Sequence, residues 1–178
     1  MSNKEKILEI ARTSLFIALL IVLQMATASQ VVTGPVVNLM LILSVMTCGL
    51  APGLYVAAFS PVIAKILGIG PLWSLIPFIA AGNVSLVFLW HFIGNRNMGR
   101  KYFAYVAALA CASVAKFLVL YIGIVRIAVP MILGLPEQQS AVISIMFSIP
   151  QLINAIVGGI FAIVLLPALK KAIGARRE

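Results

Sequence analysis

Charged residues divide this chain of 178 residues into apolar segments that are long enough to cross a membrane. Only 10% of the residues are charged and 63% are apolar, and the mean hydropathy is +1.16. Because a helix needs about 20 predominantly apolar residues to span a bilayer, this composition excludes a soluble domain and leaves room for about six spans. We therefore expect a single integral membrane domain over residues 1–178, an all-α bundle of six transmembrane helices.

The turn-forming residues place the six helices at about residues 7–27, 36–50, 54–67, 74–93, 102–128 and 140–166, with loops at 29–35, 51–53, 68–73, 95–101 and 130–139. Ten of the 13 lysines and arginines then lie at one end of the bundle, namely Lys4, Lys6, Arg12, Arg96, Arg100, Lys101, Lys170, Lys171, Arg176 and Arg177. The positive-inside bias makes this end cytoplasmic and places both termini there. Orientation in the membrane thus accounts for the net charge of +9, and no nucleic acid partner is expected.

The three remaining cations, Lys65, Lys116 and Arg126, lie within or at the edge of apolar segments. The chain contains no aspartate, and its four glutamates fall near the termini or in a loop. A charge inside the bilayer costs about 2.5–3.5 kcal/mol on insertion scales, so an embedded ionisable residue suggests a functional role. We expect the missing negative charge to arrive as a ligand.

Several polar residues are predicted at similar depths. At about 1.5 Å per residue, Lys65 lies roughly 5 Å and Lys116 roughly 14 Å inside the outer helix ends. Asn83 lies roughly 14 Å and Gln151 roughly 16 Å from the same side, with Asn154 one turn deeper on the face that it shares with Gln151. Together they predict a cationic, amide-lined cavity that opens to the outside.

Two residues are expected at the mouth of this cavity: Trp73, in the loop GIGPLW, where it can stack on a planar ligand, and Arg126, at the outer edge. Structural alternatives remain open for five of these candidates. Lys65 can snorkel to the interface, and Lys116 can be neutral or contact a partner. Gln151 and Asn154 can bond neighbouring helices, and Trp73 can belong to an interfacial aromatic belt.

Hydrolytic and metal chemistry find no support in the sequence. The chain has one histidine, no aspartate and two isolated cysteines. These residues do not provide a cluster of metal ligands or a pair of acid–base catalysts. A phosphate-binding glycine loop is also missing, so the chain is not expected to use ATP itself. We expect no metal, no cofactor and no enzymatic activity.

The first predicted helix carries Ser14 and Ala18, a small-xxx-small pair that lets another helix approach closely. Such a pair serves either packing within the chain or docking onto a second membrane subunit, and the sequence alone leaves both readings open.

These features resemble the substrate-binding S component of energy-coupling factor (ECF) vitamin transporters. The resemblance covers nearly the whole chain and rests on its length, the six spans, the small pair in the first helix and the basic loop between the fourth and fifth helices. It also rests on the layout of three segments: residues 34–38 (GPVVN), the Pro61-centred third helix, and residues 68–83 (GIGPLWSLIPFIAAGN).

The resemblance implies that Ser14 and Ala18 contact a transmembrane coupling subunit, although two alanines are usual in the family. It implies a substrate pocket near the outer surface, ATP hydrolysis on two separate cytoplasmic subunits, and residence in the cytoplasmic membrane of a bacterium or archaeon. The substrate would be a vitamin or a vitamin precursor. The three embedded cations narrow it to an anionic or electron-rich heteroaromatic compound.

Two other classes of membrane protein fit part of the sequence. A non-transport scaffold, like the six-span proteins of the cell-shape machinery, has a similar size and basic ends, but it would bind no small molecule. A carrier driven by an ion gradient is disfavoured because such sites usually employ an embedded carboxylate.

Overall fold

The computed structural model describes residues 3–26, 30–96 and 101–174. The helices are, in chain order, α1 (Asn3–Ala26), α2 (Gln30–Cys48), α3 (Leu50–Ile66), η1 (Trp73–Leu75), α4 (Ile76–Gly94), α5 (Lys101–Leu120), η2 (Tyr121–Leu133), α6 (Glu137–Met146) and α7 (Ile149–Gly174). No strand occurs in the described ranges, so the predicted all-α fold is confirmed. Residues 97–100 of the basic loop, residues 175–178 of the tail and residues 27–29 lie outside them.

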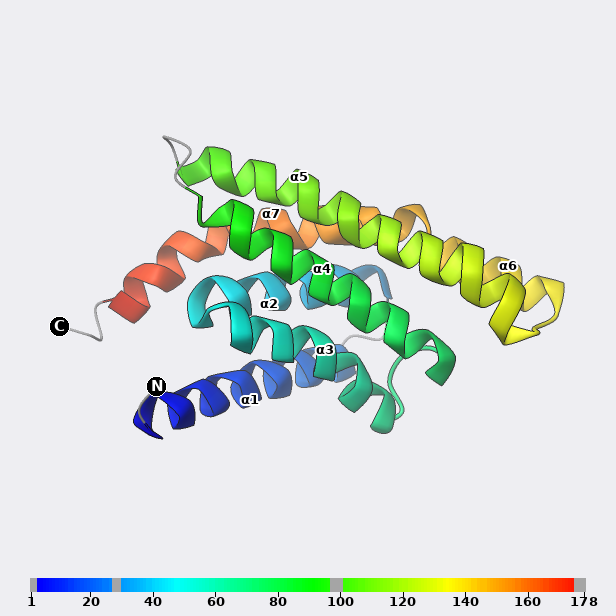
Figure 1. The fold of residues 1–178 in the computed structure, drawn as a ribbon, viewed down its shortest axis with the longest axis horizontal. Coiled ribbons are helices and arrows are strands. Elements are labelled where there is room, and N and C mark those ends of the chain that lie inside the picture. The colour runs from blue at the N-terminus through cyan, green and yellow to red at the C-terminus, as the bar shows by residue number, and fades with distance from the viewer. Residues whose placement is uncertain (1–2, 27–29, 97–100, 175–178) are drawn as a thin grey trace.

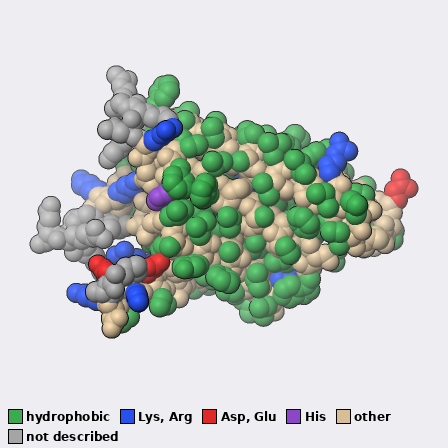
Figure 2. Space-filling view, in the orientation of Figure 1, with side chains coloured by type: hydrophobic (Ala, Val, Ile, Leu, Met, Phe, Trp, Pro, Cys, Tyr) green, Lys and Arg blue, Asp and Glu red, His purple; other side chains and the backbone are tan. Residues whose placement is uncertain are grey.

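The helices have the length and composition expected of a membrane protein. By these two criteria, four described helical segments can cross a bilayer: Asn3–Ala26, Trp73–Gly94, Tyr102–Leu133 and Glu137–Ala172. Val32–Cys48 and Leu50–Ile66 are apolar but shorter. Figure 2 shows hydrophobic side chains over the middle of the visible face, with most lysines and arginines gathered at the end where the termini lie.

Near the start of α2 and α3, the structure is helical where the sequence predicted loops. α2 begins at Gln30 and contains Pro35, and α3 begins at Leu50, so Ala51, Pro52 and Gly53 form its first turn. A proline in the first turn of a helix costs little because its missing N–H has no partner there. The turn between α2 and α3 narrows to Gly49, whose φ of 102° favours glycine.

At the opposite end of the bundle, α5 continues into η2, a π-helical segment, as far as Leu133. The chain then reverses at Gly134, which has a φ of 55°, so the loop predicted over residues 130–139 shrinks to residues 134–136. The single helix predicted over residues 140–166 is broken at residues 147–148, before Pro150, into α6 and α7. A proline disfavours helical geometry in the preceding residue, which explains a break near this point.

Two apolar clusters hold the bundle together. The larger surrounds α2 and includes Leu41, Ile42 and Trp90, whereas the smaller joins Leu120 and Phe147 near η2 and α6. In Figure 1, α1 and α3 lie along one edge of the molecule and α5 lies along the opposite edge, with α2 and α4 between them.

Candidate functional site

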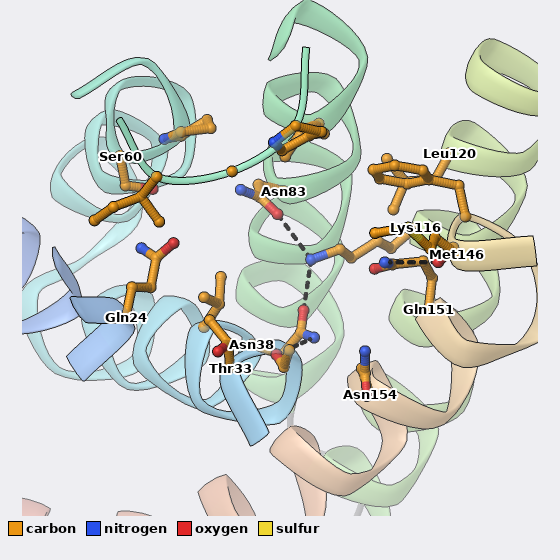
Figure 3. A pocket seen from close by; sticks show the side chains of 18 residues that line it. Gln24, Thr33, Asn38, Ser60, Asn83, Lys116, Leu120, Met146, Gln151 and Asn154 are labelled. Carbon is orange, nitrogen blue, oxygen red and sulfur yellow. Dashed lines mark hydrogen bonds between the residues drawn. The ribbon is translucent and has the colours of Figure 1, made fainter. Parts of the chain in front are cut away.

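Lys116 lies at the centre of a buried polar group that joins three helices. Its Nζ donates to Oδ1 of Asn38 on α2 at 2.6 Å and to Oδ1 of Asn83 on α4 at 2.7 Å (Figure 3). The three side chains are only 4%, 1% and 2% exposed. Hydrogen bonds from an ammonium group are stronger than neutral ones, so the two amide oxygens partly replace the water that this cation loses.

The orientation of each amide follows from its other hydrogen bond. Nδ2 of Asn38 donates to the Gly34 carbonyl at 2.9 Å, and Nδ2 of Asn83 reaches the Ala57 carbonyl at 3.5 Å. With the amide nitrogens turned toward backbone carbonyls, both side-chain oxygens face Lys116. An ammonium group has three N–H donors, and the two bonds to the amide oxygens use two of them.

This polar group borders a cavity of about 390 Å³. The residues that line it are Gln24, Thr33, Gly34, Val37, Asn38, Ser60, Pro61, Ile69, Gly70, Pro71, Ile79, Asn83, Lys116, Leu120, Met146, Phe147, Gln151 and Asn154. They include part of the loop after α3 and the break between α6 and α7, which places the cavity toward the end of the bundle opposite the described termini. Lys116 is the one formal charge among the lining residues in the described ranges.

Close helix contacts bring α2 and α7 together beside this cavity. A Cβ added at Gly34 on α2 would collide with the Asn154 side chain, and a Cβ added at Gly158 on α7 would collide with the Pro35 carbonyl and with Asn38. Glycine at these two positions therefore allows the amides of Asn38 and Asn154 to reach one space from different helices.

Four of the residues that sequence reasoning selected line this cavity: Asn83, Lys116, Gln151 and Asn154. Gln151 also donates from Nε2 to the Met146 carbonyl at 3.1 Å, across the break between α6 and α7. The Asn154 side chain is 6% exposed and makes no hydrogen bond with the part of the chain that the structure describes.

The structure does not bring the other three selected residues, Lys65, Trp73 and Arg126, into the cavity lining. Lys65 is in the last turn of α3 and is partly buried, and Trp73 is 55% exposed at the start of η1. Arg126 is on the exposed face of η2, where its guanidinium lies 5.6 Å from the centre of the Tyr121 ring.

Sequence reasoning missed several lining residues, above all Asn38 and Ser60, which are each 1% exposed. Both are polar residues inside apolar segments, and the same signal identified Asn83. Gln24 on α1 and Thr33 on α2 complete the polar wall near the loop after α3.

The small pair on α1 faces outward. Ser14 and Ala18 are both exposed, so neither is packed inside the bundle. Ser14 also borders a groove of about 360 Å³ between α1 and α3 that Tyr55 and Phe59 line from α3. No group of three or more histidines, cysteines or glutamates that could hold a metal occurs in the residues described.

Comparison with known proteins identifies the family. Residues 8–170 match the model of the ECF transporter substrate-specific component. No curated protein and no solved structure matched the chain. Because the matched region covers nearly all of the 178 residues, the chain belongs to this family: it is a substrate-specific component of an ECF transporter and a multi-pass protein of the cytoplasmic membrane.

Proposed function

We propose that this chain captures a water-soluble vitamin or vitamin precursor, anionic or heteroaromatic, in the cavity around Lys116. The observation that carries the proposal is a buried ammonium group bonded only to neutral amide oxygens, in a cavity whose described lining contains no acidic residue. A small molecule with negative or electron-rich character would complete this environment.

The distribution of charge supports uptake from the outside. Lysines and arginines gather at the end of the bundle that holds the described termini, and the cavity lies toward the other end. With the positive end in the cytoplasm, the cavity faces the external side.

Membership of this family implies interaction with the energy-coupling module. We further propose that a transmembrane coupling subunit docks on α1 at Ser14 and Ala18, and that two cytoplasmic ATPase subunits drive transport. The outward exposure of both residues supports this assignment, because small residues let a partner helix approach closely. This chain would then deliver its substrate without hydrolysing ATP.

The first test is whether the purified chain carries a small ligand. Native mass spectrometry should detect a bound compound, and Lys116→Ala should weaken its binding at least tenfold, which corresponds to about 1.4 kcal/mol. Lys171→Ala is the matched control, because this exposed lysine lies at the other end of the bundle and should leave binding unchanged. If the chain binds no small molecule, a role as a membrane scaffold explains it better than substrate capture. If Lys116→Ala binds the ligand with unchanged affinity, Lys116 has a structural role.

A further inference from the structure

The charges of the cavity set a limit on the charge of its ligand. In its ammonium form Lys116 contributes one positive charge, and its two partners, Asn38 and Asn83, are neutral. A ligand with one negative charge therefore neutralises the site. A dianion such as a phosphate monoester would leave one negative charge buried, and a cation would add to the positive charge; both are costly away from water.

The donors of the cavity argue for a carboxylate in particular. Lys116 has one N–H left after its bonds to the two amides, which suits one carboxylate oxygen. No arginine lines the described cavity, and arginine is the residue that binds phosphate through two parallel bonds.

Two further polar side chains of the lining are free to bond to a molecule in the cavity. The Ser60 hydroxyl and the Asn154 amide are 1% and 6% exposed, and neither makes a hydrogen bond with the residues that the structure describes. Figure 3 shows Ser60 and Asn154 on different sides of the Lys116 ammonium, from α3 and α7. The polar atoms of both side chains are accessible from the cavity, so a ligand can take over the hydrogen bonds that water would make there.

The rest of the lining is largely apolar. Pro61, Ile69, Ile79, Leu120 and Phe147 cover the walls between these polar points. The volume of about 390 Å³ is near the lower end of the range of about 300–1,000 Å³ for small-molecule pockets. A compact ligand with an uncharged body fits this lining.

From these observations, and resting on the proposed function, we infer that the substrate is a compact monocarboxylate with an uncharged polar body. Lys116 binds the carboxylate, and Ser60 and Asn154 bind polar groups of the body. Lys116 thus determines selectivity for charge, whereas Ser60 and Asn154 determine only affinity for the body.

The test compares probes that differ only in charge. The purified full chain is titrated calorimetrically with nicotinate and nicotinamide, pantothenate and pantothenol, and biotin and its amide, together with thiamin as a cation and pyridoxal phosphate as a dianion. We expect the tightest binder to be a monocarboxylate, with its neutral partner at least tenfold weaker. The wild-type comparison needs no variant and so does not depend on whether a variant folds.

Variants then separate the roles of the residues. Lys116→Gln should reduce the ratio between carboxylate and neutral partner to less than about threefold, a difference of under 1 kcal/mol. Ser60→Ala and Asn154→Ala should weaken both members of the pair equally and keep the ratio. Lys171→Gln, which removes an exposed lysine at the other end, should change neither value.

Several results would overturn the inference. Tightest binding of thiamin, of pyridoxal phosphate or of a neutral partner would contradict it while leaving the proposed capture of a small molecule intact. An unchanged ratio in Lys116→Gln would contradict the role of Lys116. If the folded chain binds no probe, it is incubated with a small-molecule extract of cells and the bound compound is identified by mass spectrometry. A bound monocarboxylate supports the inference, any other bound compound overturns only the monocarboxylate assignment, and no bound compound overturns the proposed function as well.

Discussion

At the scale of single residues, the balance of polar groups around Lys116 explains how a lysine can be buried inside a membrane bundle. Its Nζ bonds to two amide oxygens at 2.6 and 2.7 Å, and these bonds recover part of the lost hydration. Neutral amides do not supply a counterion, however. The site is therefore stable enough to form without ligand, yet it retains an attraction for an incoming negative charge.

A counterion built into the protein should therefore compete with the ligand for Lys116. Asn38→Asp places a carboxylate at the position of an oxygen that lies 2.6 Å from Lys116 Nζ. We expect the variant to stay folded and to bind the anionic ligand at least tenfold more weakly, a loss of about 1.4 kcal/mol. Calorimetric titration measures the effect, and Asn95→Asp, which adds the same charge at an exposed position after α4, is the control. Undiminished binding in Asn38→Asp would show that the ligand does not depend on the positive charge of Lys116.

Part of this residue pattern could be predicted from the sequence. Depth along a helix identified Lys116, Asn83, Gln151 and Asn154, which all line the cavity. Depth does not say which way a side chain faces, which is why Arg126 was also selected although it lies on an exposed face.

Asn38 was missed for a different reason. The predicted helix began at residue 36, which places Asn38 at its end. α2 in fact begins at Gln30, so Asn38 lies eight residues, or about 12 Å, along the helix. An error in one helix boundary thus concealed a buried site residue.

At the scale of helices, the close contact between α2 and α7 maintains the shape of the cavity. A Cβ at Gly158 would meet the backbone of α2 at the Pro35 carbonyl and the Leu39 nitrogen, which cannot move aside. A Cβ at the neighbouring Gly159 would instead meet the end of the Leu109 side chain. The two glycines thus pack against partners of different rigidity.

We therefore predict different outcomes for two neighbouring substitutions. Gly158→Ala should destabilise the folded protein by about 1–3 kcal/mol and weaken ligand binding, because α2 and α7 must separate and carry Asn38 and Asn154 with them. Gly159→Ala should cost less and spare binding, because Leu109 can change its side-chain conformation. Denaturation in detergent and calorimetric titration measure both effects, and equal losses in the two variants would contradict the assigned role of Gly158.

The helix ends also show which features of the fold a sequence pattern predicts well. The apolar segments predicted the helical regions because burial in lipid requires every backbone group to bond within its helix. The loops were predicted too long because proline was taken as a helix end. Pro35 is inside α2 and Pro130 is inside η2, which matches the greater tolerance of membrane helices for proline.

At the scale of the whole molecule, the features assigned to binding and to coupling are separate. The cavity is lined mainly by α2 to α7, whereas the exposed small pair lies on α1 at the edge of the bundle. Gln24, near the carboxyl end of α1, is the one α1 residue among those that line the described cavity. Substitutions on the outer face of α1 should therefore affect assembly without changing the ligand site.

Because the two features are separate, we predict that a bulky residue at position 18 will impair transport but not ligand binding. Ala18→Trp should leave ligand affinity within about twofold of the wild type, since the exposed Ala18 side chain is not among those that line the cavity. It should lower cellular uptake at least tenfold, as expected if about 1.4 kcal/mol of contact with the coupling subunit is lost. Calorimetry on the purified chain and uptake of labelled ligand in cells measure the two quantities. Val106→Trp, at a position 58% exposed on α5 at the opposite edge, should change neither and controls for the size of the added ring. If Ala18→Trp abolishes binding, the face of α1 supports the ligand site itself, and if it leaves uptake intact, the coupling subunit docks elsewhere.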